Sequence, residues 1–142
     1  MKKLIAVTIA IAMLATGVLV ALPRADAEAP KPAIEAAKTW LSIVDRGDYA
    51  ASHDEAATYF KEAVDKDTWV AQIKAVRAPL GEVVSRNVIG ARALSSLPGA
   101  PDGEYVVIQI ETEFANKKSS VETITPMLDG ARGWRVSGYY IR

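Results

Sequence analysis

Ser52, His53 and Asp54 stand next to one another and are the three residue types of a hydrolase triad. A nucleophile, a base and an orienting acid must converge in space, however, and they generally come from separated segments. The spacing Ser52-x-x-Glu55 is instead typical of a capping box, in which the serine hydroxyl accepts from the amide three residues on and the glutamate reaches back. We therefore expect Ser52 and Glu55 to cap a helix, and we assign no catalytic residue.

The sequence lacks the residues that metal, cofactor and nucleic-acid sites need. His53 is the only histidine and the chain has no cysteine, whereas zinc and copper sites need three or four such ligands. The run Asp45-Arg46-Gly47-Asp48 lacks the ligand spacing of a calcium loop, and no glycine-rich phosphate loop is present. No arm or block of basic residues offers itself to a nucleic acid. We expect no metal, no cofactor and no nucleic-acid partner.

Glu111, Glu113 and Glu122 with Arg135 form the one charged group expected on neighbouring strands. Acid–base chemistry would require one of these carboxylates to be desolvated. The sequence favours a solvated sheet face with cross-strand ion pairs instead. The three tryptophans could line a ligand pocket, but large aromatic residues at this spacing are more often core.

Apolar residues at three- and four-residue spacing predict three helices in the first half of the domain. The first runs from Ala33 to a stop at Gly47, the second begins at Ser52, and the third begins near Asp67 and ends at Pro79. The side chains expected on their buried faces are Ile34, Ala37, Trp40, Leu41 and Val44, then Ala56, Tyr59, Phe60 and Val64, then Trp69, Ile73 and Val76.

After Gly81 the pattern changes to the alternation that is typical of strands. The expected strands are 82–93, 105–114, 121–128 and 134–141, with a long loop over 94–103. The sequence thus predicts an α+β fold in which three N-terminal helices pack on a curved, four-stranded antiparallel sheet. We expect the helices on the face of Val106, Ile108 and Ile110. Tyr139 and Ile141 make part of the opposite face apolar, which suggests that a second subunit covers it.

The first 27 residues indicate export. Lys2 and Lys3 precede an uncharged run over 4–22, and Pro23 and Ala25-Asp26-Ala27 follow with the pattern that a signal peptidase reads. We expect cleavage after Ala27, a periplasmic location and a single mature domain over 28–142. The alternative is an uncleaved helix over 4–22 that anchors the domain to the inner membrane, since this run is long enough to span a bilayer.

Several motifs occur in order along nearly the whole mature chain. They are Trp40-Leu41, Asp45-x-Gly47-x-Tyr49, Arg77-x-Pro79-Leu80-Gly81, Arg86, Leu97-Pro98-Gly99-x-Pro101-Asp102-Gly103-x-Tyr105, Phe114, Lys117, Glu122 and Trp134-Arg135-Val136-x-Gly138-Tyr139. Together they resemble the bacterial exported family known as domain of unknown function 4019. That resemblance implies no established activity, and it implies an aromatic residue where this chain has His53, which weakens a catalytic role for the histidine.

The order of helices and then a curved sheet is also similar to the cone of the nuclear-transport-factor-2-like, or cystatin-like, superfamily. This fold-level analogy implies a concavity that could take a small apolar ligand. If the concavity exists, we expect Trp40, Tyr59, Arg86 and Tyr139 at its rim.

Three hypotheses for function follow. The leading one is a non-enzymatic binding or protein-interaction module of the periplasm, homodimeric or with another protein partner. The second is a small-molecule isomerase or hydratase that uses the concavity, which needs a buried carboxylate or a tyrosine donor facing an open pocket. The third is an accessory protein that an uncleaved N-terminal helix holds at the membrane.

Overall fold

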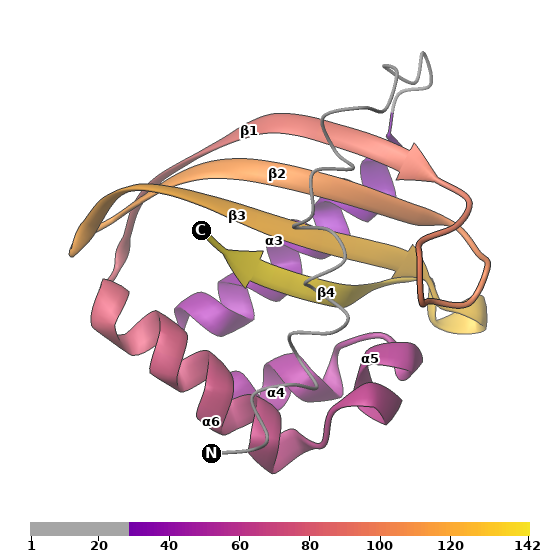
Figure 1. Ribbon diagram of the computed structural model, residues 1–142, viewed down its shortest axis with the longest axis horizontal. Helices are drawn as coiled ribbons and strands as arrows, with labels where there is room; N and C mark the ends of the chain where they lie inside the picture. The colour runs from indigo at the N-terminus through magenta and orange to yellow at the C-terminus, as the bar shows by residue number, and fades with distance from the viewer. Residues whose placement is uncertain (1–28) are drawn as a thin grey trace.

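The computed structural model describes residues 29–142, a helical half followed by an antiparallel sheet (Figure 1). The signal segment expected over 1–27 lies outside the described residues. The helices are α3 (Lys31–Asp45), α4 (Tyr49–Asp54), α5 (Thr58–Ala63) and α6 (Lys66–Arg77), with short 3₁₀ turns η1 (Ala78–Leu80) and η2 (Gly130–Arg132). The strands are β1 (Val83–Leu94), β2 (Tyr105–Phe114), β3 (Lys117–Leu128) and β4 (Trp134–Ile141).

The four strands form one open sheet in the order β1-β2-β3-β4, with every neighbour antiparallel. The α+β prediction is therefore confirmed. The register places Ile108 of β2 opposite Ile124 of β3, and Ile124 opposite Tyr139 of β4. A register shift at Thr125/Pro126 allows the proline to lie inside a central strand, because a bulge tolerates the missing N–H donor.

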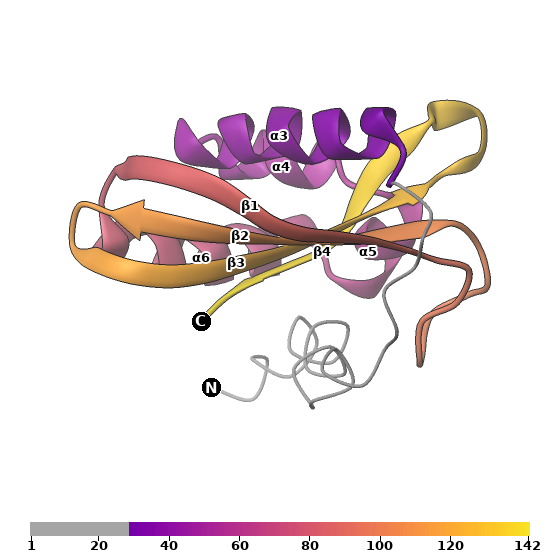
Figure 2. The same ribbon diagram turned by 90° about the horizontal axis from the view of Figure 1, so that it is seen from above.

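Helix α3 runs lengthwise across one face of the sheet, where it packs on β3 and β4 (Figure 2). Its buried residues recur every three or four positions, so one face of the helix is apolar. This face meets Val106, Ile108 and Ile110 of β2 in the main core, as expected. The helix ends where Gly47 adopts a φ of 77°, a conformation that glycine adopts without steric cost.

The expected second helix is two helices, so the described residues contain four α-helices and not three. The break falls at 55–57, between α4 and α5. There the Ala57 amide donates to the carbonyl of Val136 (2.8 Å), and Arg132 donates to the carbonyl of Ala56 (3.1 Å). Backbone groups that would have continued the helix are instead bonded to β4 and to the turn before it.

The capping box expected at Ser52 and Glu55 does not form. Ser52 lies inside α4, where its hydroxyl donates to the carbonyl of Tyr49 (2.6 Å) and accepts from the indole N–H of Trp69 (2.9 Å). Glu55 follows the last residue of this helix. The expectation was wrong because the helix begins three residues earlier, at Tyr49, which places the serine too late to cap it.

Two further details differ from the expectation. Val76 was expected to face inward but is 49% exposed, whereas Trp69 and Ile73 on the same helix are buried. Strand β3 begins at Lys117 and not at Val121, because Ala115 and Asn116 alone make the turn from β2. Within residues 29–142, no helix is long and apolar enough to cross a membrane.

Candidate functional site

A cleft of about 160 Å³ lies between α3 and the beginning of β4. Its lining on α3 has the spacing i, i+3, i+4 and i+7, so one stripe of the helix forms one wall. Three consecutive residues of β4 and one residue after α4 form the rest. The lining residues are Ala36, Thr39, Trp40, Ile43, Glu55, Trp134, Arg135 and Val136.

The floor of the cleft is apolar and held in place. Trp40 is 3% exposed, and its indole N–H donates to the carbonyl of Ser52 (2.8 Å). Its ring meets that of Tyr139 edge-on, with 5.3 Å between the ring centroids. Val136 is buried beside it, while Trp134 is only half-buried. A ligand in this cleft would therefore contact a fixed aromatic floor and a second, more accessible indole.

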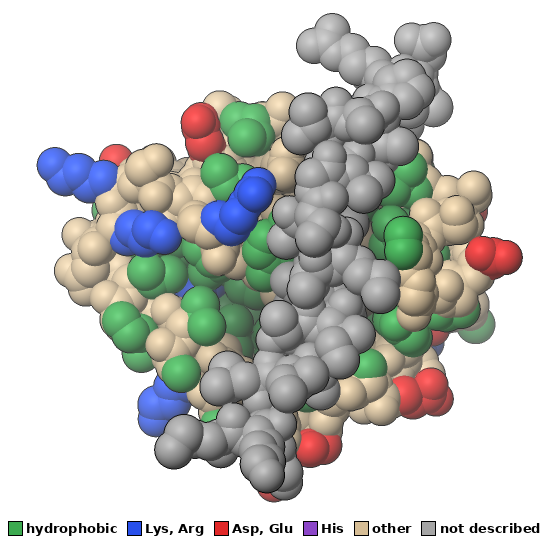
Figure 3. Space-filling model, viewed as in Figure 1, with side chains coloured by type: hydrophobic (Ala, Val, Ile, Leu, Met, Phe, Trp, Pro, Cys, Tyr) green, Lys and Arg blue, Asp and Glu red, His purple; other side chains and the backbone are tan. Residues whose placement is uncertain are grey.

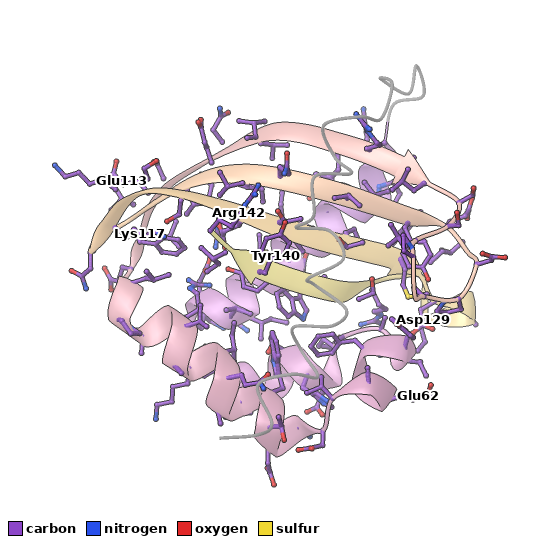
Figure 4. The ribbon with its side chains drawn as sticks, in the orientation of Figure 1. Glu62, Glu113, Lys117, Asp129, Tyr140 and Arg142 are labelled. Atoms are coloured by element: carbon purple, nitrogen blue, oxygen red, sulfur yellow. The ribbon has the colours of Figure 1, made fainter. Side chains whose placement is uncertain are left out.

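Both charged residues of the lining are bonded to each other. Arg135 Nη1 lies 2.5 Å from Glu55 Oε2, and Arg135 Nε donates to the carbonyl of Arg132 (3.2 Å). Arg132 is itself held by Asp129, whose carboxylate also accepts from the amide and the hydroxyl of Thr58 at 3.0 Å each. Figure 4 shows Asp129 at this end of the sheet, next to α5. The cleft thus has an internally neutralised ion pair among its lining residues.

A buried ionic cluster adjoins Trp40 through Tyr139 and is centred on Glu122, which is 0% exposed. Its Oε1 accepts from Arg86 Nε (2.7 Å) and from the hydroxyl of Thr112 (2.5 Å). Its Oε2 accepts from Arg86 Nη2 (3.1 Å) and from the hydroxyl of Tyr139. Burial and the neighbouring Glu122 carboxylate hold the pKa of Tyr139 well above its usual value. The phenol therefore stays protonated and donates.

Asp45, at the end of α3, extends the cluster towards solvent. It accepts from Arg86 Nη1 (2.6 Å) and from Arg77 Nη2 (2.8 Å). The guanidinium of the buried Arg77 also lies over the ring of Phe114, 5.1 Å from its centroid. Two arginines and two carboxylates thus neutralise each other and join α3 and α6 to β1 and β3. Such a buried network is costly to disrupt one member at a time.

The pH dependence of stability should report on Asp45. Burial acts to raise the pKa of its carboxyl, but hydrogen bonds from Arg86 and Arg77 outweigh that effect, so its pKa lies below the usual value. A carboxyl with a lowered pKa in the folded state contributes stability above the unfolded pKa of about 4, and loses it as the pH falls through the folded value. We expect thermal unfolding midpoints to fall steeply below about pH 4. The variant Asp45→Asn should start lower at neutral pH and decline less steeply.

The pKa of Asp129 is also lowered, chiefly by the amide of Thr58, so Asp129→Asn is the matched comparison. Each variant alone should flatten part of the acid decline, and the double variant should flatten more. An Asp45→Asn protein whose midpoints decline as steeply as those of the wild type would contradict the assignment.

The structure brings three of the four expected rim residues together. Trp40 lines the cleft, Tyr139 contacts Trp40, and Arg86 binds the same glutamate as Tyr139. Tyr59 lies elsewhere: its hydroxyl donates to the carbonyl of Gly99 (3.2 Å), and it packs with a second, smaller apolar cluster. Arg86 and Tyr139 themselves belong to the ionic cluster and are not among the residues that line the cleft.

The charged group expected on a solvated sheet face does not gather. Glu111 is exposed, Arg135 pairs with Glu55, and Glu122 is buried on the helix-facing side. The burial of Glu122 could have been found from the sequence, because alternation along β3 puts it on the same face as Ile124. The ion pair of Glu55 could not be predicted from the residues near it in the sequence, because its partner Arg135 is distant in the chain.

Ser52, His53 and Asp54 each have different partners in the structure. The buried His53 ring places Nε2 2.7 Å from the carbonyl of Val64, so Nε2 carries the proton and donates. Asp54 is exposed and pairs with Lys66 at 2.5 Å. The three side chains do not bond to one another. Across residues 29–142, no group of three or more histidine, cysteine, aspartate or glutamate side chains is placed to hold a metal ion.

Comparison with known proteins gives a family and no nearer relative. No curated protein matches the chain, and no solved structure matches it. A family described as "Protein of unknown function (DUF4019)" has a model that matches residues 36–139, from the first turns of α3 to Tyr139 in β4. The match spans well over half of the chain and includes the cleft and the ionic cluster. The chain therefore belongs to the DUF4019 family.

Proposed function

We propose that this protein is an exported, non-enzymatic binding module that holds a small, largely apolar molecule in the cleft between α3 and β4. The observation that carries the proposal is the composition of the lining. Trp40, Ile43, Trp134 and Val136 supply apolar surface, while the charged Glu55 and Arg135 already neutralise each other. Concave sites with apolar walls and a few polar groups are where small molecules usually bind.

The ionic cluster supports a structural role more than a chemical one. Both oxygens of Glu122 accept hydrogen bonds, from Arg86, Thr112 and Tyr139. A carboxylate whose oxygens each accept two hydrogen bonds would have to lose one of these donors before it could accept a proton from a substrate. Glu122 is also not among the residues that line the cleft.

The specific observation in favour of an isomerase or hydratase is the buried Glu122 with its Tyr139 donor. That function would need a substrate to reach them past Trp40, as in a cone with an open interior. The likeness to the nuclear-transport-factor-2-like cone is part of this second proposal. A Trp40→Ala variant that gained catalytic turnover of a candidate substrate, and lost it again with Glu122→Gln, would favour it.

Export and partners belong to the same proposal. The basic start, the uncharged run and Ala25-Asp26-Ala27 support cleavage after Ala27. Strand β1 is at the sheet edge and exposes Val84, Val88 and Ile89, which supports a second copy or another protein partner. Figure 3 shows hydrophobic side chains on the described part of the sheet face opposite α3.

Native mass spectrometry of protein exported from the full-length gene tests location and assembly together. A mass that begins at Glu28 supports export with cleavage, whereas a retained N-terminus supports the membrane anchor. A dimer mass supports the second copy, and additional small-molecule mass supports the occupied cleft. A monomer mass without added ligand would contradict the proposal that a second copy of the chain binds.

Toluene is a suitable probe for the cleft, because it is small, apolar and uncharged. We expect saturation-transfer NMR to detect toluene bound to the wild-type protein, and Ala36→Leu to weaken binding by about tenfold because the longer side chain fills the cleft. Thr39→Leu, at an exposed position of the same wall, should act alike. The matched control is Lys38→Ala, which lies on α3 outside the lining. Toluene that binds the two filled variants as tightly as it binds the wild-type protein would lie outside the cleft, and that result would overturn the proposed function.

A further inference from the structure

An adjacent hydrogen-bond donor and acceptor are left over in the charged pair of the cleft. Arg135 uses Nη1 for Glu55 and Nε for the carbonyl of Arg132. Within residues 29–142, Arg135 Nη2 and Glu55 Oε1 have no hydrogen-bond partner. Because Nη2 shares its carbon with Nη1, and Oε1 shares its carbon with Oε2, both unused atoms lie near the ion pair that joins the two residues.

The pair is fixed from both sides. Arg135 is a residue of β4 opposite Met127, and the carbonyl of Arg132 positions its guanidinium. Glu55 follows the last turn of α4, where its amide donates to the carbonyl of Ala51 (2.9 Å). The two side chains are 30% and 53% exposed, so a ligand can reach them without unfolding the rim.

The charge of the pair argues against an ionic ligand. An anion would be attracted to Arg135 but repelled by Glu55, and a cation would meet the reverse. Either ion gains a full partner only by separating the existing pair, which sacrifices its charge-assisted hydrogen bond. A neutral molecule that carries both an acceptor and a donor can bond to the unused atoms while the pair stays intact.

The walls beside the pair add a requirement on shape. Trp134 is half-buried, and its indole N–H has no hydrogen-bond partner within the described part of the chain. Trp40 forms the floor with its own N–H already bonded to Ser52. Flat aromatic walls in a volume of about 160 Å³ suit a single planar ring.

We propose that the cleft selects a small planar molecule that carries a neutral amide. Its carbonyl accepts from Arg135 Nη2, its N–H donates to Glu55 Oε1, and its ring lies against Trp134 and the floor. This inference rests on the proposed function, because it names the ligand class of the same cleft.

Four probes of nearly equal size separate the alternatives: benzamide, benzoate, benzylamine and toluene. We expect benzamide to bind about tenfold more tightly than toluene, since two hydrogen bonds are added, and both ions to bind more weakly than benzamide. Toluene that binds as tightly as benzamide would overturn the amide selection and leave the proposed function standing. If none of the four binds, the proposed function itself fails.

Substitutions in the Glu55–Arg135 pair should change which of the four probes binds most tightly. Glu55→Gln frees the Arg135 guanidinium and should make benzoate the preferred ligand, whereas Arg135→Gln frees Glu55 and should make benzylamine preferred. Asp54→Asn is the control, because Asp54 is the neighbouring acid and pairs with Lys66 outside the cleft. A pair that serves only stability would lower the affinity for all four probes without reordering them, and that result would overturn the inference.

Discussion

The variant Glu122→Gln should lower the free energy of unfolding by about 3 kcal/mol, although the side chain keeps its size and shape. Both carboxylate oxygens accept from Arg86, Oε1 from Nε and Oε2 from Nη2. In the glutamine variant the amide NH₂ group replaces one of these two oxygens. It then faces Arg86 Nε or Nη2, so two hydrogen-bond donors oppose each other in either orientation. The buried cluster then carries two arginines against the single carboxylate of Asp45, with little water to solvate the excess charge.

Urea denaturation followed by circular dichroism measures this loss. Glu111→Gln is the matched control, because Glu111 lies on the neighbouring strand β2 and is exposed. Its change should stay within about 0.5 kcal/mol. Equal midpoints for the two variants would show that Glu122 does not hold the cluster together.

Much of the fold was predictable from the period of the apolar residues. Strands β2 and β4 have the bounds that strict alternation predicts, and the helix-facing side of β2 is the expected one. Strand β2 was predictable because its apolar residues alternate and its helix-facing side is buried along the whole strand, so the local pattern and the tertiary environment agree there. Strand β4 has the expected bounds although its central residues are buried on both faces. The loop over 94–103 was equally readable from its prolines and glycines.

The break between α4 and α5 was not readable, because no local residue demands it. Ala56 and Ala57 favour a helix by their intrinsic propensity. Their backbone groups are instead bonded to Val136 and Arg132, which lie about eighty positions further along the chain. Tertiary hydrogen bonds thus override local preference at this break.

The candidate site was predictable only in part, for a related reason. The sequence predicted Trp40 and Tyr139 at the rim of a pocket, and in the structure their rings contact each other. The charged members were misjudged, since an isolated glutamate in a strand is more often solvated than buried. What reverses that rule at Glu122 is Arg86, thirty-six positions away, whose two donors make its burial tolerable.

The largest loss from a single truncation in the helical layer is expected at Trp69, where Trp69→Ala should cost about 3–5 kcal/mol. Trp69 is 1% exposed, its ring meets Phe60 edge-on at 4.8 Å between centroids, and its N–H donates to Ser52. Truncation leaves a cavity between α4 and α6 and removes support from Trp40, whose ring lies 6.0 Å away. Urea denaturation by circular dichroism should show the loss, and toluene affinity should fall with it, because Trp40 is the floor of the cleft.

Trp134→Ala provides the contrast that separates stability from binding. Trp134 is half-buried, lines the cleft and packs only against the margin of the main core, so its truncation should cost only about 1–2 kcal/mol. The Trp134→Ala variant should nevertheless lower the affinity for benzamide more strongly than any substitution outside the lining of the cleft. If both truncations destabilised the protein equally and neither affected the probes, the cleft would be an ordinary gap between α3 and β4. A Trp134→Ala protein that keeps most of its stability but loses benzamide affinity would show that Trp134 serves the cleft directly, whereas Trp69→Ala lowers stability and affinity together through Trp40.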